Sequence, residues 1–189
     1  MENLRLLKQD KKGFTLQEML YVIAILLIVM SIAIPTVTTI RKNLQISELD
    51  DTARQIYLIA QNKLTTMKAT GTLVNLNTAL EDRYPAQKLG VIGLCPQDYT
   101  LEDDSWKNLY ALNNTDEIVT QSIMGDGSIL ISSLDGSSEF MIELNPETGD
   151  VYGVFYSKSS FDYNDVNSEG LPTRERSDRK DIMVGYYGG

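Results

Sequence analysis

The sequence predicts an α+β fold, in which a long helix over about residues 14–70 packs on an antiparallel β-sheet head. Two observations predict it. An apolar run near the N-terminus passes into apolar residues that recur every three or four positions, which is the helical period. Farther along, short β-like runs alternate with turn sequences, which is typical of an antiparallel meander. With 189 residues, the chain has room for one modest domain and an extra element.

The first half of the predicted helix is a candidate membrane span. From Phe14 to Ile34 there are 21 residues, which is long enough to cross a bilayer core and too long for a secretory signal. Basic residues exceed acidic ones just before this run, which predicts an N-terminus in the cytoplasm. A carboxylate in such a helix costs on the order of 2–3 kcal/mol, so Glu18 needs a function. The four residues of the run that are not apolar are Thr15, Gln17, Glu18 and Ser31.

The second half of the helix is predicted to be amphipathic and to pack on the head. Pro35 removes one helix hydrogen bond and is the expected site of a kink. Gly71 is a plausible C-cap. The apolar residues that recur beyond Pro35 are Ile46, Leu49, Ala53, Ile56, Ala60, Leu64 and Met67.

The head is predicted to contain an antiparallel meander of three strands, at Ser128–Leu134, Glu139–Asn145 and Asp150–Lys158. The sequences "DGSS" and "NPETGD" supply turns between them. The terminal segment Asp181–Gly189 is a candidate for a last strand. Without a second cysteine, this tail must be held by strand pairing and by the packing of Tyr186 and Tyr187.

Two short helices are also expected in the head. "NLNTALEDRY" suggests one with Asn77 as the N-cap residue, and "NTDEIVTQSI" suggests another that Asn114 or Thr115 opens.

Composition excludes several classes of function. A net charge of −9 argues against nucleic acid as the main partner. The absence of histidine removes the commonest general base and most zinc sites. No Gly-rich phosphate loop and no G-x-S-x-G motif is present, so we expect neither an enzyme nor a cofactor. The single cysteine, Cys95, is expected to be a small buried apolar residue, with a reactive or intermolecular thiol as the alternative.

A polar segment near the C-terminus has oxygen ligands of the kind that calcium prefers, although it lacks the glycine and distal glutamate of an EF-hand. A solvated loop is the plainer interpretation. The residues of this weak calcium candidate are Asp162, Asn164, Asp165 and Asn167.

Three details of the N-terminal segment go beyond a simple anchor. A basic leader ends at Gly13, the sequence Phe-Thr-Leu-Gln-Glu follows at residues 14–18, and the apolar run ends at Pro35. Together they resemble the type IV pilin family, including the pseudopilins of type II secretion and DNA-uptake systems, whose prepilins carry a class III leader. Gln17 departs from the family pattern, which often has an aliphatic residue there.

The resemblance implies a pilin-like division of the chain into a cleaved leader (1–13), a transmembrane and filament-core half-helix (14–40) and a globular head that includes the amphipathic half-helix (41–189). It implies cleavage after Gly13 by prepilin peptidase and N-methylation of Phe14. It also implies that Glu18 forms an assembly salt bridge with the Phe14 ammonium of a neighbouring subunit, which sets register because a misplaced subunit would leave a buried charge uncompensated.

The function implied is a structural subunit of a type IV pilus, used for adhesion, motility or DNA uptake. The alternatives are a pseudopilin of a type II secretion or competence system, or a minor pilin. The implied partners are further copies of the chain, prepilin peptidase and an inner-membrane assembly platform. The precursor is expected in the cytoplasmic membrane, as a single-pass protein with its N-terminus inside, and the assembled subunit in an extracellular pilus.

Overall fold

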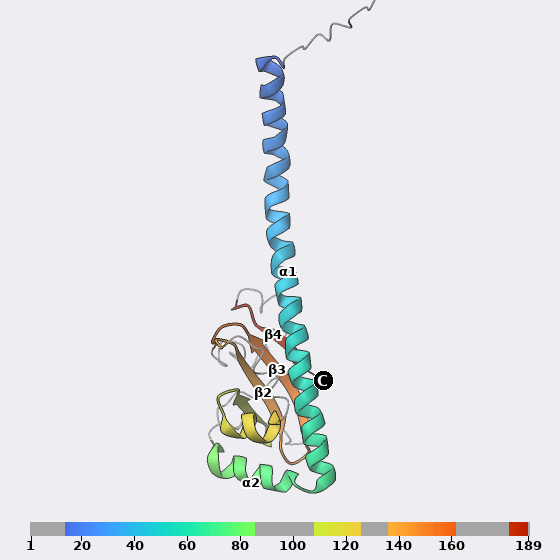
Figure 1. Cartoon of the computed structure of the whole chain (residues 1–189), viewed down its shortest axis with the longest axis vertical. Coiled ribbons are helices and arrows are strands. Elements are labelled where there is room, and N and C mark those ends of the chain that lie inside the picture. The colour runs from blue at the N-terminus through green and yellow to red at the C-terminus, as the bar shows by residue number, and fades with distance from the viewer. Residues whose placement is uncertain (1–13, 86–107, 126–135, 162–181, 189) are drawn as a thin grey trace, which may run out of the picture. The chain divides into compact units, whose positions relative to one another are not determined.

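The computed structural model describes residues 14–85, 108–125, 136–161 and 182–188 (Figure 1). It confirms the α+β fold, with one long helix followed by a four-stranded antiparallel sheet. The chain divides into two compact units, one up to Arg41 and one from Lys42 onward. The elements in chain order are α1 (Leu16–Thr70), α2 (Leu73–Arg83), β1 (Tyr110–Asn113), the π-helical turn η3 (Val119–Ile123), β2 (Glu139–Asn145), β3 (Asp150–Ser157) and β4 (Gly185–Gly188).

In the first unit, every described side chain is exposed. The helix begins at Leu16, two residues after the predicted start, and it continues through Pro35 without interruption. A kink of its axis at Pro35 stays a prediction. This part of the helix is apolar on all sides. It therefore lacks the separate apolar and polar faces of a helix that packs on a core and contacts water.

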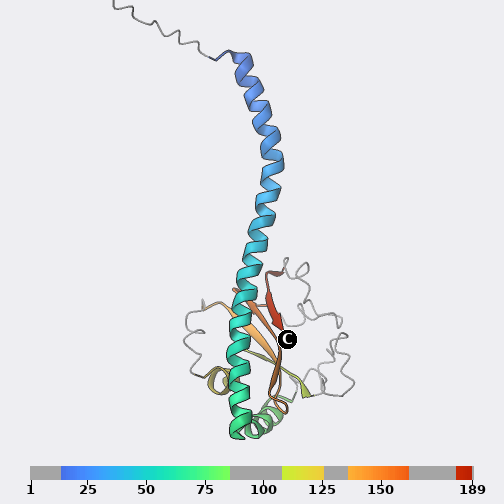
Figure 2. The same ribbon diagram turned by 90° about the vertical axis from the view of Figure 1, so that its right-hand side faces the viewer.

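In the second unit, α1 lies along one face of the sheet (Figures 1 and 2). The predicted apolar face is confirmed, since six of its seven residues are buried and Met67 packs partly buried against the same core. Strands β2 and β3 supply Phe140, Ile142 and Val154 from the opposite side of this core. The six buried residues are Ile46, Leu49, Ala53, Ile56, Ala60 and Leu64.

The predicted C-cap of α1 is confirmed at Gly71. Its φ of +74° is a left-handed conformation that glycine adopts without steric cost. The amide of Gly71 donates to the carbonyl of Lys68 at 3.3 Å, and the amide of Thr72 donates to the carbonyl of Met67 at 2.9 Å. These two bonds form a Schellman motif, which satisfies carbonyls at the helix end.

The next helix begins earlier than the sequence suggested. α2 starts at Leu73, so Asn77 lies inside the helix and its assignment as the N-cap was wrong. The N-cap position belongs to Thr72, which makes no side-chain capping bond. The Schellman turn fixes this start, because it reverses the chain directly into α2, whose Leu76 and Leu80 face the core.

The strands pair in chain order, β1-β2-β3-β4, and each pair is antiparallel. The predicted strand at residues 139–145 is confirmed, and the one at 150–158 ends one residue earlier than expected. The expected last strand forms as β4 against β3. The edge strand β1 was not predicted, and the predicted strand at Ser128–Leu134 lies outside the described residues.

The second predicted short helix begins at Glu117, so neither Asn114 nor Thr115 opens it. Asp116 precedes the first helical residue, and its carboxylate accepts the amide of Asn113 at 3.0 Å. Asn114 instead extends the pairing with β2, because its backbone amide and its side chain both bond to the residues around Phe140. The assignment failed because asparagine suits both a helix cap and a strand end.

The C-terminal strand is fixed to α1 and β3 by several contacts. The backbone amide of Tyr186 donates to Asp50 Oδ1 at 2.9 Å. The centroids of the Tyr186 and Phe155 rings are 4.8 Å apart. The ring of Tyr187 meets that of Tyr57 edge-on at 5.0 Å. The predicted packing of both tyrosines is therefore confirmed, and these contacts hold the tail without a disulfide.

A glycine lets this strand approach α1 closely. A Cβ atom on Gly185 would lie 2.2 Å from the carbonyl carbon of Leu49 and 2.4 Å from its oxygen. No side chain fits in that space, so Gly185 lets the strand touch the helix backbone.

Candidate assembly site at the start of the long helix

The first turn of α1 is closed by a pair of reciprocal hydrogen bonds between Thr15 and Glu18. The backbone amide of Thr15 donates to Glu18 Oε2 at 2.8 Å, and the amide of Glu18 donates to Thr15 Oγ1 at 3.2 Å. The Thr15 hydroxyl also donates to Glu18 Oε2, at 2.9 Å. This is a capping box, in which the first and fourth residues satisfy each other's amides.

The capping box explains how a single copy tolerates Glu18. One carboxylate oxygen receives two hydrogen bonds at the positive end of the helix dipole, where a negative charge is favourable. The other oxygen, Oε1, has no partner among residues 14–85 or the other described segments. The arrangement therefore places a carboxylate close to Phe14, with one oxygen still available to a positive group.

A second polar pair lies on the same stretch of helix. Gln17 Nε2 donates to the hydroxyl of Tyr21 at 3.0 Å, one turn farther along. Tyr21 lies one turn beyond both Gln17 and Glu18, at i+4 and i+3, so the three side chains lie within an arc of about 100° on the helix.

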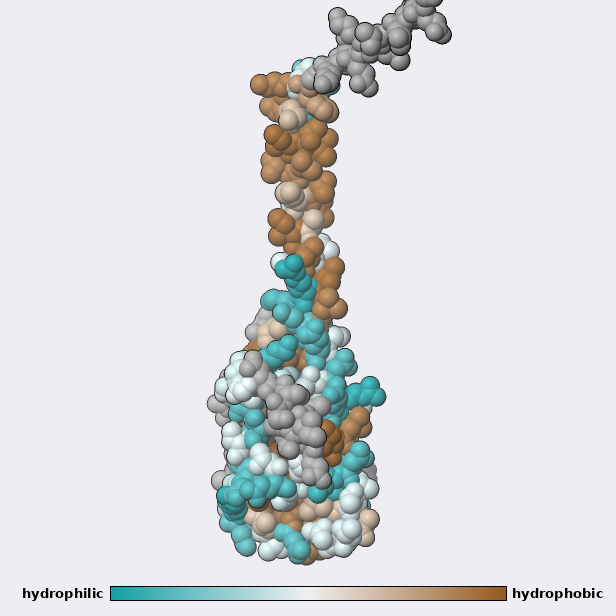
Figure 3. Space-filling model, viewed as in Figure 1, coloured by the Kyte–Doolittle hydropathy of each residue, from teal (hydrophilic) through white to brown (hydrophobic). Residues whose placement is uncertain are grey.

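Apolar side chains surround this polar start. Figure 3 shows them on the visible face of the first part of α1. Leu16 is 85% exposed and Ile32 is 67% exposed, although both are large and apolar. In the part of the chain that the structure describes, α1 is the one helix that is long and apolar enough to cross a membrane. A surface of this kind requires lipid or other protein around it.

The region around Pro35 carries hydroxyls that bond to its own backbone. Thr38 and Thr39 both donate to the carbonyl of Pro35, at 2.8 and 3.0 Å. Thr36 donates to the carbonyl of Ile32 at 2.9 Å, and Ser31 donates to the carbonyl of Ile28 at 2.7 Å. Such back-bonding lets hydroxyl groups remain in an apolar helix and often bends it.

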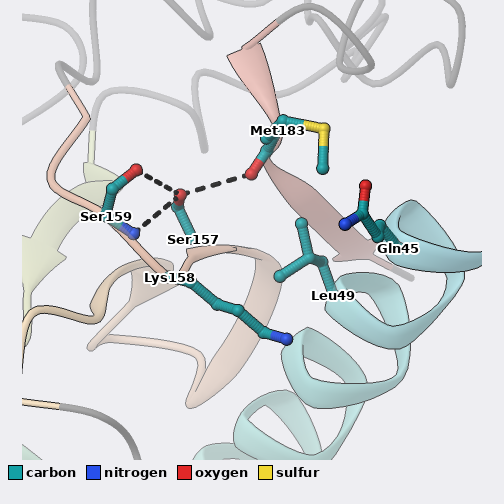
Figure 4. Close-up of a pocket in the computed structure, with 6 residues that line it drawn as sticks. All are labelled: Gln45, Leu49, Ser157, Lys158, Ser159 and Met183. Atoms are coloured by element: carbon teal, nitrogen blue, oxygen red, sulfur yellow. Dashed lines mark hydrogen bonds between the residues drawn. The ribbon is translucent and has the colours of Figure 1, made fainter. Parts of the chain in front are cut away.

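The head contains a small pocket between α1 and the segments that flank β3 and β4 (Figure 4). It has a volume of about 90 Å³, and the Ser157 hydroxyl beside it donates to the carbonyl of Met183 at 3.2 Å. This volume is far below the roughly 300–1,000 Å³ of a typical small-molecule site. Among the described residues, no group of three metal-binding side chains is present. The lining residues are Gln45, Leu49, Ser157, Lys158, Ser159 and Met183.

The structure brings Glu18 to the helix start, close in sequence to Phe14, and keeps Pro35 inside the helix. Gly13 and Cys95 lie outside the described residues, as does the calcium candidate at residues 162–167. The sequence analysis missed the part played by Thr15. The pattern T-x-x-E before an apolar run signals a capping box, so residues 15–18 contained the information.

Comparison with known proteins addresses the N-terminal segment alone. No curated protein and no solved structure matches the chain. A family model, described as the prokaryotic N-terminal methylation motif, matches residues 8–34. This segment includes the expected cleavage site, the capping box and most of the exposed apolar helix. Such a leader implies processing by prepilin peptidase and pilus-type assembly. The chain thus carries at residues 8–34 the prokaryotic N-terminal methylation motif, which is the class III leader of type IV pilins and pseudopilins.

Proposed function

We propose that this protein is a structural subunit of a type IV pilus. The observation that carries the proposal is the position of the Glu18 carboxylate at the start of an apolar helix, inside the methylation motif. Its free oxygen faces no positive group within the described residues of its own chain. Cleavage after Gly13 would create an ammonium at Phe14, which is the charge that Glu18 needs.

The proposed partner for this charge is Phe14 of a second copy. A neighbour displaced by four residues along the helix, or about 6 Å, would bring its terminal ammonium level with Glu18. In a dry bundle, an unpaired ion costs about 3–5 kcal/mol, so subunits in another register would be rejected. Phe14 is also the expected site of N-methylation, which retains the positive charge.

The apolar surface of α1 supports the same function. Before assembly, lipid would cover it and hold the precursor in the cytoplasmic membrane. After assembly, the helices of neighbouring copies would cover it in the filament core. The head would then lie outside the core and would carry any adhesive or motile function.

Substitutions of Glu18 test the pairing role. Glu18→Gln keeps the shape and still accepts the hydrogen bonds of Thr15, but it removes the charge. We expect the amount of sheared surface filament to fall more than about tenfold, as in Glu18→Ala, because the Phe14 ammonium loses its partner. Thr15→Val is the matched control, since it weakens the cap and keeps the charge. Wild-type filament amounts in Glu18→Gln would refute the pairing.

Mass spectrometry of the filaments tests the processing. The N-terminal peptide should begin with N-methylated Phe14, and recovery of residues 1–13 in surface filaments would overturn the assignment. A pseudopilin of a secretion or competence system carries the same leader, so it remains the alternative. Loss of protein secretion or DNA uptake on gene deletion, without loss of surface pili, would favour that alternative. We propose no enzymatic activity for the chain.

A further inference from the structure

Gln17 and Tyr21 form a hydrogen-bonded pair of side chains near the start of α1. Within the described part of the first unit, it is the one such pair that does not include Glu18. Gln17 and Tyr21 place an amide group and a hydroxyl group one turn apart in an otherwise apolar helix. Both side chains are exposed in the single copy. A polar group in an apolar bundle needs a hydrogen-bond partner, because an unsatisfied group there costs several kcal/mol.

The pair satisfies itself only in part. Gln17 Nε2 donates to the Tyr21 hydroxyl oxygen at 3.0 Å. That bond leaves the hydroxyl proton of Tyr21 as a donor and Oε1 of Gln17 as an acceptor, and neither has a partner among the residues described. One copy therefore presents a donor and an acceptor that are complementary and four positions apart.

We propose that Tyr21 of one copy binds Gln17 of a second copy of this chain. The displacement that brings Phe14 of the neighbour level with Glu18 also brings Gln17 of the neighbour level with Tyr21, since both pairs are four residues apart. The hydroxyl of Tyr21 donates to Oε1 of the neighbour's Gln17. This inference rests on the proposed filament function and on its stagger.

The contact repeats from copy to copy. In each copy, the Gln17 amide group donates to its own Tyr21, and that Tyr21 donates onward to the next copy. The result is a continuous chain of hydrogen bonds through the filament, in which each bond polarises the next. The contact joins two different groups, so it is head-to-tail and extends into a filament.

Polar contacts of this kind act as specific links between helices in an apolar environment. Gln17, Glu18 and Tyr21 share one helix face, so one neighbouring helix can meet all three. The charge pair and the hydrogen-bonded pair then require the same displacement, and a subunit in another register would lose both.

Cysteine cross-linking tests the geometry. In a Cys95→Ser background, subunits with Gln17→Cys and subunits with Tyr21→Cys are produced together, with different tags, and filaments are oxidised with copper phenanthroline. We expect a mixed disulfide dimer that joins the two tags. Each variant produced alone should give at least about tenfold less dimer, because equivalent positions in adjacent copies are offset by about 6 Å.

A mutant cycle tests the contact itself. Tyr21→Phe removes the donor and Gln17→Leu removes the acceptor, and each should reduce filament yield by about threefold, which is typical of one interhelical hydrogen bond. The double variant should lose no more than either single variant, because both changes remove the same bond. Additive losses would contradict the contact.

The outcomes separate this inference from the proposed function. Filaments that form and need Glu18, but give no mixed dimer, would overturn the Gln17–Tyr21 contact and leave the pilus function intact. That result would also follow if Tyr21 only anchors the precursor at the membrane surface. If no filament contains the wild-type chain, the proposed function itself fails.

Discussion

The two halves of α1 share one helix but differ in what surrounds them. In the first half, Leu27 is 64% exposed, and it lies among side chains that are exposed on every face. In the second half, Leu64 is fully buried within a face that packs on the sheet. The same residue type thus belongs to the core of the head in one half and, in the other, to a surface that no described residue of the chain covers. Stability of the single copy and assembly of many copies are therefore separate properties of this helix.

The largest expected effect on the stability of the head is the difference between truncating a leucine in the second half of α1 and truncating one in the first half. Leu64→Ala should lower the free energy of unfolding of the head by about 2–5 kcal/mol, because it leaves a cavity in the core. Leu27→Ala should leave that free energy unchanged and should weaken filament formation. Urea unfolding of the detergent-solubilised chain, followed by tyrosine fluorescence of the head, checks the first result. A loss of head stability in Leu27→Ala would contradict the view that only the second half of α1 stabilises the head.

A smaller loss is expected where the last strand touches the helix. Gly185→Ala places a methyl group within 2.2–2.6 Å of three atoms of Leu49, so β4 must move away from α1. We expect a loss of about 1–3 kcal/mol in the unfolding free energy.

Gly136→Ala is the matched control, since an added Cβ there meets nothing within 4 Å. Proteolysis of the C-terminal segment gives a second measurement, because an undocked β4 should be cut faster. If Gly185→Ala and Gly136→Ala have the same free energy of unfolding, the close approach of β4 to Leu49 does not contribute to the stability of the head.

The smallest effect concerns pH and is confined to the head. Arg83 donates to Glu117 Oε2 at 2.6 Å, and this hydrogen bond, together with the positive charge, holds the pKa of Glu117 below its ordinary value. A carboxyl whose pKa is lowered by folding adds stability above its unfolded pKa of about 4.3, and that stability disappears as the pH falls through the folded pKa.

The test is the difference between wild type and Glu117→Gln in urea midpoint as the pH falls from about 6 to about 3. The wild-type advantage should shrink over this interval, and it should be small, because both side chains are about half exposed to water. An advantage that grows with acidification would contradict the pairing.

The sequence predicted the parts of the fold that have a long periodic signal. The buried face of α1 repeats over five turns, and the strands at residues 139–145 and 150–157 are bounded by turn sequences. β1 has four residues, too few to show a period, and it is a strand because β2 pairs with it. The start of α2 depends on the Schellman turn at Gly71, which makes Thr72 the N-cap position and places Asn77 inside the helix.

The candidate site was predictable for a different reason. Glu18 is noticeable because a carboxylate is rare in an apolar helix, and the leader before it has a recognisable spacing. The partner that we propose for its free oxygen belongs to another molecule, so the fold of one chain does not display it. Thr15 was missed because its hydroxyl looked like one more tolerated polar group, whereas it orients the carboxylate.

The position of β4 along the chain has a consequence for the timing of biogenesis. Residues 185–188 form the strand that completes the sheet, and they emerge from the ribosome after every other described element. The apolar start of α1 emerges before all of them. A nascent chain can therefore engage the membrane before β4 is available, and the pairing of β4 with β3 can form only after β4 has been synthesised. A premature stop before Gly185 would leave an inserted helix that carries an unfinished head, which the cell's quality-control proteases can recognise.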